Sequence, residues 1–135
     1  MPTPIVHIFG NPDISMDALP LRIQGGLEER FPHVHFLALD PNENWEIPNP
    51  FIVIDTVVGL SDIHVFRGLE EFANTPAVSV HDFDALTQLR FLKKLGKLGE
   101  LIIIGVPPEF GTDEALALER VSDALSALLT EQNMQ

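Results

Sequence analysis

The sequence contains no cysteine among its 135 residues. This absence excludes a thiol nucleophile, a disulfide framework and any metal site built from thiolates. The sequence also shows no basic leader followed by an apolar stretch, and no apolar run approaches the roughly 20 residues that span a bilayer. We therefore expect a cytoplasmic protein with no signal peptide and no membrane partner.

Basic residues are scarce as well, with 8 Lys and Arg against 20 Asp and Glu and a formal net charge of −12. Such a surface repels phosphate backbones and anionic lipid headgroups, so we expect no nucleic-acid partner. The acidity suits a basic or metal-carrying partner, and a role in solubility explains it equally well. With 45% hydrophobic residues, the chain has the composition of a globular protein, and its length predicts a single domain over residues 1–135.

Several sequence motifs of common enzyme classes are missing too. The chain has neither the glycine-rich dinucleotide fingerprint nor the Gly-Lys-Ser/Thr of an NTPase, and Gly10-Asn11-Pro12 is too short for a phosphate loop. No Gly-x-Ser-x-Gly elbow is present, which disfavours a nucleophilic serine.

Hydrophobic patterning predicts alternating strands and helices. Strands are expected at 5–9, 33–39, 51–54, 63–66 (an edge strand) and 101–106, with a further short apolar run at 78–80. Helices are expected at 17–31, 83–95 and 113–129, the last capped by Thr112. This order predicts an α/β fold, a three-layer sandwich with a mostly parallel, twisted sheet of about five strands and helices on both faces.

Three of the apolar runs precede a side chain that could bind a metal. The run at 5–9 leads through Gly10-Asn11 to Asp17, the run at 51–54 ends in Asp55, and the run at 78–80 ends in His81. Ligands bind outside the carboxyl ends of the strands in open α/β sheets, so these three residues are expected to converge on one crevice. Two carboxylates and an imidazole suit Zn, Ni, Mn or Fe(II), and without a metal they could perform acid–base chemistry.

Each of these residues also has a structural explanation. Taken alone, Asp17 is better explained as a helix cap, and His81 fits equally well as a structural residue at a helix start. Asp55 is harder to explain structurally, because an unpaired charge at the edge of a buried strand costs on the order of several kcal/mol.

Other polar residues have weaker functional cases. We interpret Asp82 and Asp84 as acids of a first helical turn and His7 as a packed core histidine. The remaining histidines have no acidic partner nearby in sequence: His33, His35 and His64. The loop that carries Asp40, Glu43 and Trp45 could form a rim of the site, although a solvated loop explains it as well.

In their order along the chain, these features resemble the hydrogenase maturation endopeptidases. The matching elements are Gly10-Asn11 with Asp17, Asp55 in FIVIDTV, Ser79-Val80-His81 in SVHDFD, and LIIIGVPPE. Each motif is weak by itself, but the ordered set spans most of the chain and is fairly specific.

The resemblance implies an endopeptidase that removes a C-terminal extension from a nickel-loaded hydrogenase large-subunit precursor. It assigns Asp17, Asp55 and His81 as a catalytic triad that contacts the metal, with nickel contributed by the substrate. Binding of another divalent metal by the free protein is an alternative. A monomer suits such a transient processing enzyme. The chain departs from the family where Asp17 replaces the more usual glutamate, and where a loop beginning near Asp40 replaces an Asp-Gly-Gly motif. These departures bear on substrate choice more than on fold.

Two other readings compete with the endopeptidase. One is a domain of the same fold that binds a metal or a partner without cutting. The other is a receiver-type signalling domain, whose phosphoacceptor aspartate would correspond to Asp55. The receiver reading is disfavoured because Gly10-Asn11 replaces the acidic pair after the first strand and no lysine follows the strand at 101–106.

Overall fold

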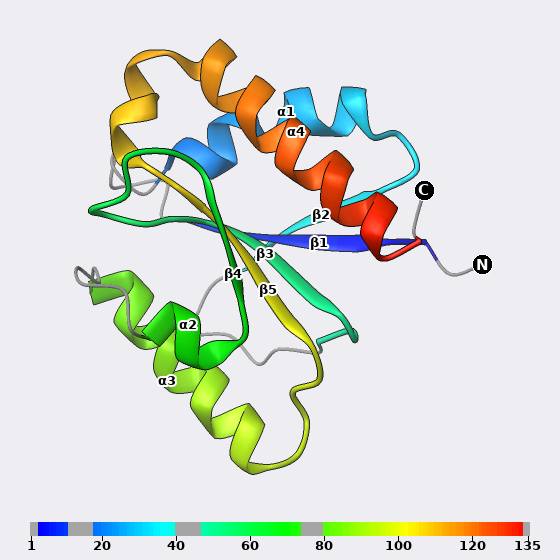
Figure 1. The fold of residues 1–135 in the computed structure, drawn as a ribbon, viewed down its shortest axis with the longest axis vertical. Helices are drawn as coiled ribbons and strands as arrows, with labels where there is room; N and C mark the ends of the chain where they lie inside the picture. Colours follow the sequence, from blue (N-terminus) through cyan, green and yellow to red (C-terminus); the bar gives the residue numbers. More distant parts are fainter. Residues whose placement is uncertain (1–2, 11–17, 40–46, 74–79, 134–135) are drawn as a thin grey trace.

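Five strands form one twisted sheet in the order β2-β1-β3-β5-β4 (Figure 1). The computed structural model describes residues 3–10, 18–39, 47–73 and 80–133, and only the backbone for residues 80–86. The strands are β1 (Ile5–Phe9), β2 (His35–Leu39), β3 (Phe51–Thr56), β4 (His64–Arg67) and β5 (Leu101–Val106). The helices are α1 (Leu19–Arg30), α2 (Leu69–Ala73), α3 (Val80–Lys94) and α4 (Glu114–Glu131), with a 3-10 turn η1 (Pro108–Thr112) after β5.

The sheet is parallel except at one edge. β1 pairs in parallel with β2 and β3, β3 pairs in parallel with β5, and the edge strand β4 pairs antiparallel with β5. The expected mostly parallel sheet and the expected edge strand are therefore confirmed. A receiver-type domain has the strand order 2-1-3-4-5. The antiparallel β4 outside β5 excludes that alternative.

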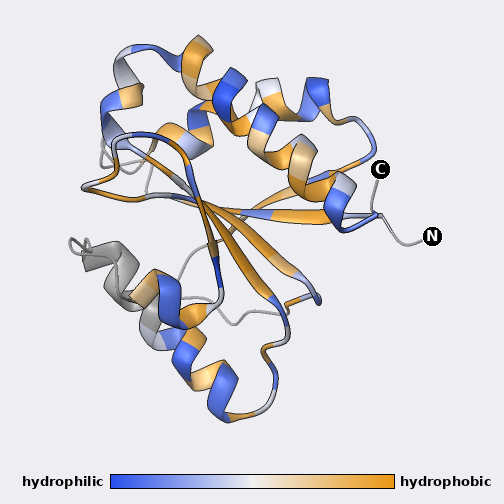
Figure 2. Ribbon diagram, viewed as in Figure 1, coloured by the Kyte–Doolittle hydropathy of each residue, from blue (hydrophilic) through white to orange (hydrophobic). Residues whose placement is uncertain are grey.

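Helices cover both faces of the sheet, which confirms the predicted three-layer architecture (Figure 1). α1 and α4 lie on one face, over a core that includes Ile52 and Ile54. α2 and α3 lie on the other, over a core that includes Phe51 and Val53. Because successive strand residues point to opposite faces, β3 supplies both cores and all six of its residues are buried. Figure 2 shows the same arrangement, with mostly hydrophobic strands between helices that carry hydrophilic residues.

The contact between α1 and α4 depends on a glycine. A Cβ atom added to Gly26 would lie 2.5 Å from a side-chain carbon of Leu118, so the two helices approach closely there. Gly25 has open space around it and contributes nothing to this contact.

None of the helices in the described part of the chain has both the length and the apolarity that a bilayer crossing requires.

Several element boundaries differ from the sequence-based expectations, and three of the differences change how a residue is assigned. Val80 and His81 belong to the first turn of α3, so the run at 78–80 does not deliver His81 from a strand end. The two valines at 78 and 80 form too short a strand signal to outweigh a helix of 15 residues. β3 continues through Asp55 to Thr56, because both residues stay paired with β5.

The third difference concerns the cap of α4. Asp113, not Thr112, is the N-cap, and its carboxylate accepts a hydrogen bond from the Leu116 amide at 3.1 Å. The Thr112 hydroxyl instead donates to the Glu109 carbonyl at 3.1 Å within η1. The short helix α2 had no counterpart among the predicted elements, since five residues are too few to show helical periodicity.

Because Gly105 in β5 has no side chain, the side chains of neighbouring residues pack directly over its backbone. A Cβ atom there would lie 2.8 Å from Phe66, 2.9 Å from Leu60 and 3.1 Å from Val57. We predict that Gly105→Ala lowers the free energy of unfolding by about 1–3 kcal/mol through overpacking. Gly25→Ala is the matched control, since it places a methyl group in open space within a helix and should stabilise by roughly 0.5–1 kcal/mol. Urea unfolding of both variants tests this, and equal stability of Gly105→Ala and wild type would contradict it.

Candidate functional site at the carboxyl edge of the sheet

Asp55 lies at the carboxyl end of the central strand β3 and is only 2% exposed. It alternates with Phe51 and Val53, so it lies on the face that α2 and α3 cover. Its partner in the neighbouring strand is Gly105. An ionised carboxylate at this depth costs on the order of several kcal/mol unless hydrogen bonds, opposite charge or a metal compensate it. A carboxylate buried this deeply at a strand end is more typical of a functional site than of a packing position.

The strand order places Asp55 at the switch point of the sheet. The chain passes from β1 to β2 on one side, whereas β3 and β5 lie on the other side of β1. Ligand crevices of open α/β sheets form at such a point, outside the carboxyl ends of the flanking strands. Ile8 is in register with Ile54, so β1 ends beside Asp55.

The other two predicted site residues are described only in part. Asp17 lies outside the described residues, and His81 is described by its backbone alone. α3 begins at the carboxyl edge of the sheet and ends near its amino edge, and it covers the face on which Asp55 lies (Figure 1). The backbone of His81 is therefore on the same edge and face as Asp55. Among the described side chains, no three His, Asp or Glu residues form a group that could hold a metal ion.

The side chains of His64 and Glu71 form a polar pair on the same edge of the sheet, which the sequence analysis did not predict. His64 and Asp55 both pair with Gly105, from opposite sides of β5. His64 Nε2 lies 3.1 Å from Glu71 Oε1, so the expectation that His64 has no acidic partner nearby in sequence is wrong. The turn at Gly68, with φ +99°, folds α2 back beside β4 and brings the two side chains together. The sequence feature that could have predicted this pair is a histidine and a glutamate on either side of a glycine at a turn.

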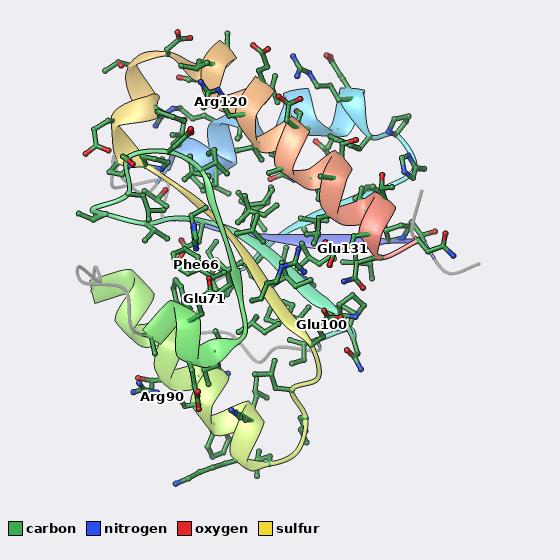
Figure 3. The ribbon with its side chains drawn as sticks, viewed as in Figure 1. Phe66, Glu71, Arg90, Glu100, Arg120 and Glu131 are labelled. Carbon is green, nitrogen blue, oxygen red and sulfur yellow. The ribbon has the colours of Figure 1, made fainter. Side chains whose placement is uncertain are left out.

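Glu71 also binds the strand from which His64 comes. Its second carboxylate oxygen accepts a hydrogen bond from the Arg67 amide at 3.1 Å. This backbone hydrogen bond, followed by the one with His64, lowers the pKa of Glu71 below its ordinary value. Figure 3 shows Glu71 beside Phe66, on whose ring His64 packs edge-on at 4.6 Å between centroids. Both members of the pair are about half exposed, so it contributes little to stability and more to fixing the orientation of the imidazole.

His7 is a packed core histidine, as expected. It is 5% exposed and its ring meets that of Phe51 edge-on at 5.2 Å between centroids. Burial lowers its pKa, so the folded protein holds it neutral. His33 and His35 are exposed. The candidate rim residues Asp40, Glu43 and Trp45 lie outside the described residues.

Solved structures share this fold over nearly the whole chain. The hydrogenase maturating endopeptidase HybD from E. coli superposes with a TM-score of 0.59 at 19% identity, covering 92% of this chain and 93% of HybD. The chain has the fold of a hydrogenase maturation endopeptidase. An endopeptidase from Escherichia coli, solved in solution, gives 0.60 at 20% identity over 95% of this chain and 93% of its own.

A third structure with this fold is a protein from Wolinella succinogenes, with a TM-score of 0.56 at 14% identity, covering 94% of this chain and 99% of that one. No protein-family model matches the sequence, and no curated protein matches it in a sequence search. The likeness is therefore one of fold, and the resemblance stated from the sequence is confirmed at that level.

The buried state of His7 predicts a pH dependence of stability. Around and below the ordinary histidine pKa of 6.5, the unfolded chain takes up a proton at this site more readily than the folded chain, because burial lowers the pKa of His7. His7 therefore lowers the free energy of unfolding as pH falls below about 6.5, by at most about 1.4 kcal/mol per pH unit. We expect His7→Leu to lose less stability than wild type between pH 7.5 and pH 5.5, in urea unfolding at both pH values.

Exposed His33 provides the control for this comparison. Carboxylates that titrate over the same range are common to all three proteins, so only the difference between variant and wild type is informative. His33→Leu should follow the pH dependence of wild type. An unchanged pH dependence in His7→Leu would contradict the assignment of a buried neutral imidazole.

Proposed function

We propose that this chain is an endopeptidase that removes a C-terminal extension from the precursor of a nickel-iron hydrogenase large subunit. The observation that carries the proposal is the fold shared with HybD over more than nine-tenths of both chains. The position of Asp55 supports it, because this buried carboxylate lies at the edge where ligands bind in such sheets. The ordered sequence motifs around Asp17, Asp55 and His81 agree with the same assignment.

In this proposal, Asp17, Asp55 and His81 contact the nickel that the substrate carries. Carboxylate and imidazole groups are suitable ligands for that ion. Nickel already inserted into the precursor would supply the charge that these groups recognise, so cleavage would follow metal loading. The chain has no cysteine, and it therefore offers no thiolate that could compete for the metal of the substrate.

Asp55 is suited to this role because β3 holds it rigidly. The strand is paired on both sides by β1 and β5, and its six residues are buried. A carboxylate in such surroundings interacts with a cation more strongly than one in water, because the effective dielectric constant is lower. Peptide hydrolysis could then proceed through a carbonyl polarised by the metal or through a water activated by a carboxylate.

Replacement of Asp55 tests the proposal most directly at a described residue. We expect Asp55→Asn to lower the rate of processing of a nickel-loaded precursor by about a thousandfold or more, because a neutral amide neither attracts the cation nor accepts a proton. Asp123→Asn, an exposed acid on α4, is the matched control and should process normally. Mass spectrometry of the precursor measures the rate.

The fold of the Asp55 variant has to be checked in parallel. Circular dichroism and urea unfolding should show a folded protein, since the side-chain volume is unchanged. A folded Asp55→Asn protein with normal processing would overturn the proposed role. Loss of the fold would instead assign Asp55 to the structure.

His81 is expected to act in recognition of the metal. His81→Ala should weaken binding of the nickel-loaded precursor by about tenfold, the loss of one ligand contact worth about 1.4 kcal/mol, and leave binding of the nickel-free precursor unchanged. His33→Ala, on an exposed position remote from β3, is the control. Calorimetric titration of both precursor forms gives the comparison. Equal affinity of His81→Ala and wild type for the loaded form would remove His81 from the site.

A further inference from the structure

A groove lined by described residues lies between α2 and α3 and does not include Asp55. Its volume is about 620 Å³, and Leu69 and Ala73 of α2 and Phe91 of α3 give it apolar walls. A second groove of about 310 Å³ shares Leu69 and Lys93 with it and continues toward the start of β5. These volumes fall in the range of binding sites. His81 and Phe91 are ten residues apart on α3, so the groove lies roughly 15 Å along the helix from His81.

Positive charge gathers at this groove. Arg90, Lys93 and Lys94 line it, and with Lys97 shortly after them in sequence they make up half of the 8 basic residues in a chain of net charge −12. Three other arginines form ion pairs with carboxylates, whereas no ion pair in the described part of the chain involves any of these four. One acid, Glu70, lines the groove beside them. Figure 3 shows Arg90 projecting away from the sheet into solvent.

Large apolar side chains are exposed at the same place. Phe91 on α3 is 58% exposed, and Leu95, directly after the end of α3, is 51% exposed. The inner side of α3 is already buried, because Leu89 and Leu92 pack into the core beneath it. Apart from these two residues, the exposed large apolar side chains of the described chain comprise only Leu37. Exposed apolar side chains that gather in this way mark interaction sites.

We propose that the groove between α2 and α3 docks an acidic, amphipathic segment of a partner protein. A large apolar side chain of that segment would fill the space beside Phe91, and its carboxylates would pair with Arg90, Lys93 and Lys94. Two helices that flank an apolar groove provide the geometry for a helix bound in a groove. A concave surface on a chain of net charge −12 favours an acidic protein segment over an anionic bilayer, which the remaining surface would repel.

This inference does not depend on the proposed endopeptidase activity. Residues of the last turns of α3 line the groove, at the opposite end of that helix from His81. A partner could therefore occupy the groove while the carboxyl edge stays accessible. The groove would then add affinity for a partner without contact with any reacting atom.

The test uses the full chain and two synthetic peptides. The first peptide has about four helical turns, with Leu and Phe at positions i, i+3, i+4 and i+7 and Glu elsewhere; in the second, Gln replaces every Glu. Nuclear magnetic resonance titration of the wild-type chain should place the shifted amides in α2 and in residues 90–97. The Glu peptide should bind at least about tenfold more tightly than the Gln peptide, and its affinity should fall as salt is added.

Variants then separate charge from apolar contact. Lys94→Glu and Phe91→Ala should each weaken binding of the Glu peptide by about tenfold. Arg30→Glu, an exposed residue at the end of α1 on the opposite layer, changes the net charge as Lys94→Glu does and should stay within about twofold of wild type. Each variant is checked for a wild-type unfolding midpoint.

Several results would overturn the proposal. They are equal affinity for the Glu and Gln peptides, equal weakening by Arg30→Glu and Lys94→Glu, or no binding of the Glu peptide at about millimolar concentration. Tighter binding of the wild-type chain to phosphatidylserine vesicles than to the Glu peptide would assign the surface to a membrane instead.

Discussion

Burial of a carboxylate at the end of the central strand is the constraint around which this molecule is organised. β3 is covered on both faces and paired on both sides, so any residue on it is removed from water. Phe51, Ile52, Val53 and Ile54 of that strand bury apolar side chains in the two cores. Asp55 instead buries a carboxylate, and the fold places it at the edge where open α/β sheets bind ligands. The rest of the layer arrangement gives this position its rigidity.

α3 connects the features that bear on function. Its first turn contains His81 at the carboxyl edge, its middle packs Leu89 and Leu92 onto the sheet, and its last turns carry exposed Phe91 and the basic residues. One helix thus links the candidate site to a groove at the other edge. The acidity of the chain as a whole gives that basic groove its contrast with the remaining surface.

Much of the fold was predictable because strong apolar runs leave few alternatives. Runs such as LIIIGV are typical of strands buried on both faces of a mostly parallel sheet, and the alternation with amphipathic helices predicts the three layers. Short signals failed where a longer pattern outweighed them. The valines at 78 and 80 look like a strand, but Val80 belongs to a helix of 15 residues.

The candidate site was predictable in part. Asp55 was recognisable because an acid after four apolar residues is unusual in any buried strand. The pairing of His64 with Glu71 was not predictable, since the two side chains meet only because the chain reverses at Gly68. The spacing of histidines in a sequence does not show where such a turn lies. Asp17 and the side chain of His81 lie outside what the structure describes, so their convergence on Asp55 remains a prediction.

The measurement that tests the central claim most directly is cleavage by the wild-type protein. The purified chain is mixed with the nickel-loaded precursor of a nickel-iron hydrogenase large subunit from its own host, and with the nickel-free form of the same precursor. The account predicts that mass spectrometry detects loss of a C-terminal fragment from the loaded precursor only. An intact loaded precursor after incubation with well-folded protein would contradict the account and favour a domain that binds without cutting.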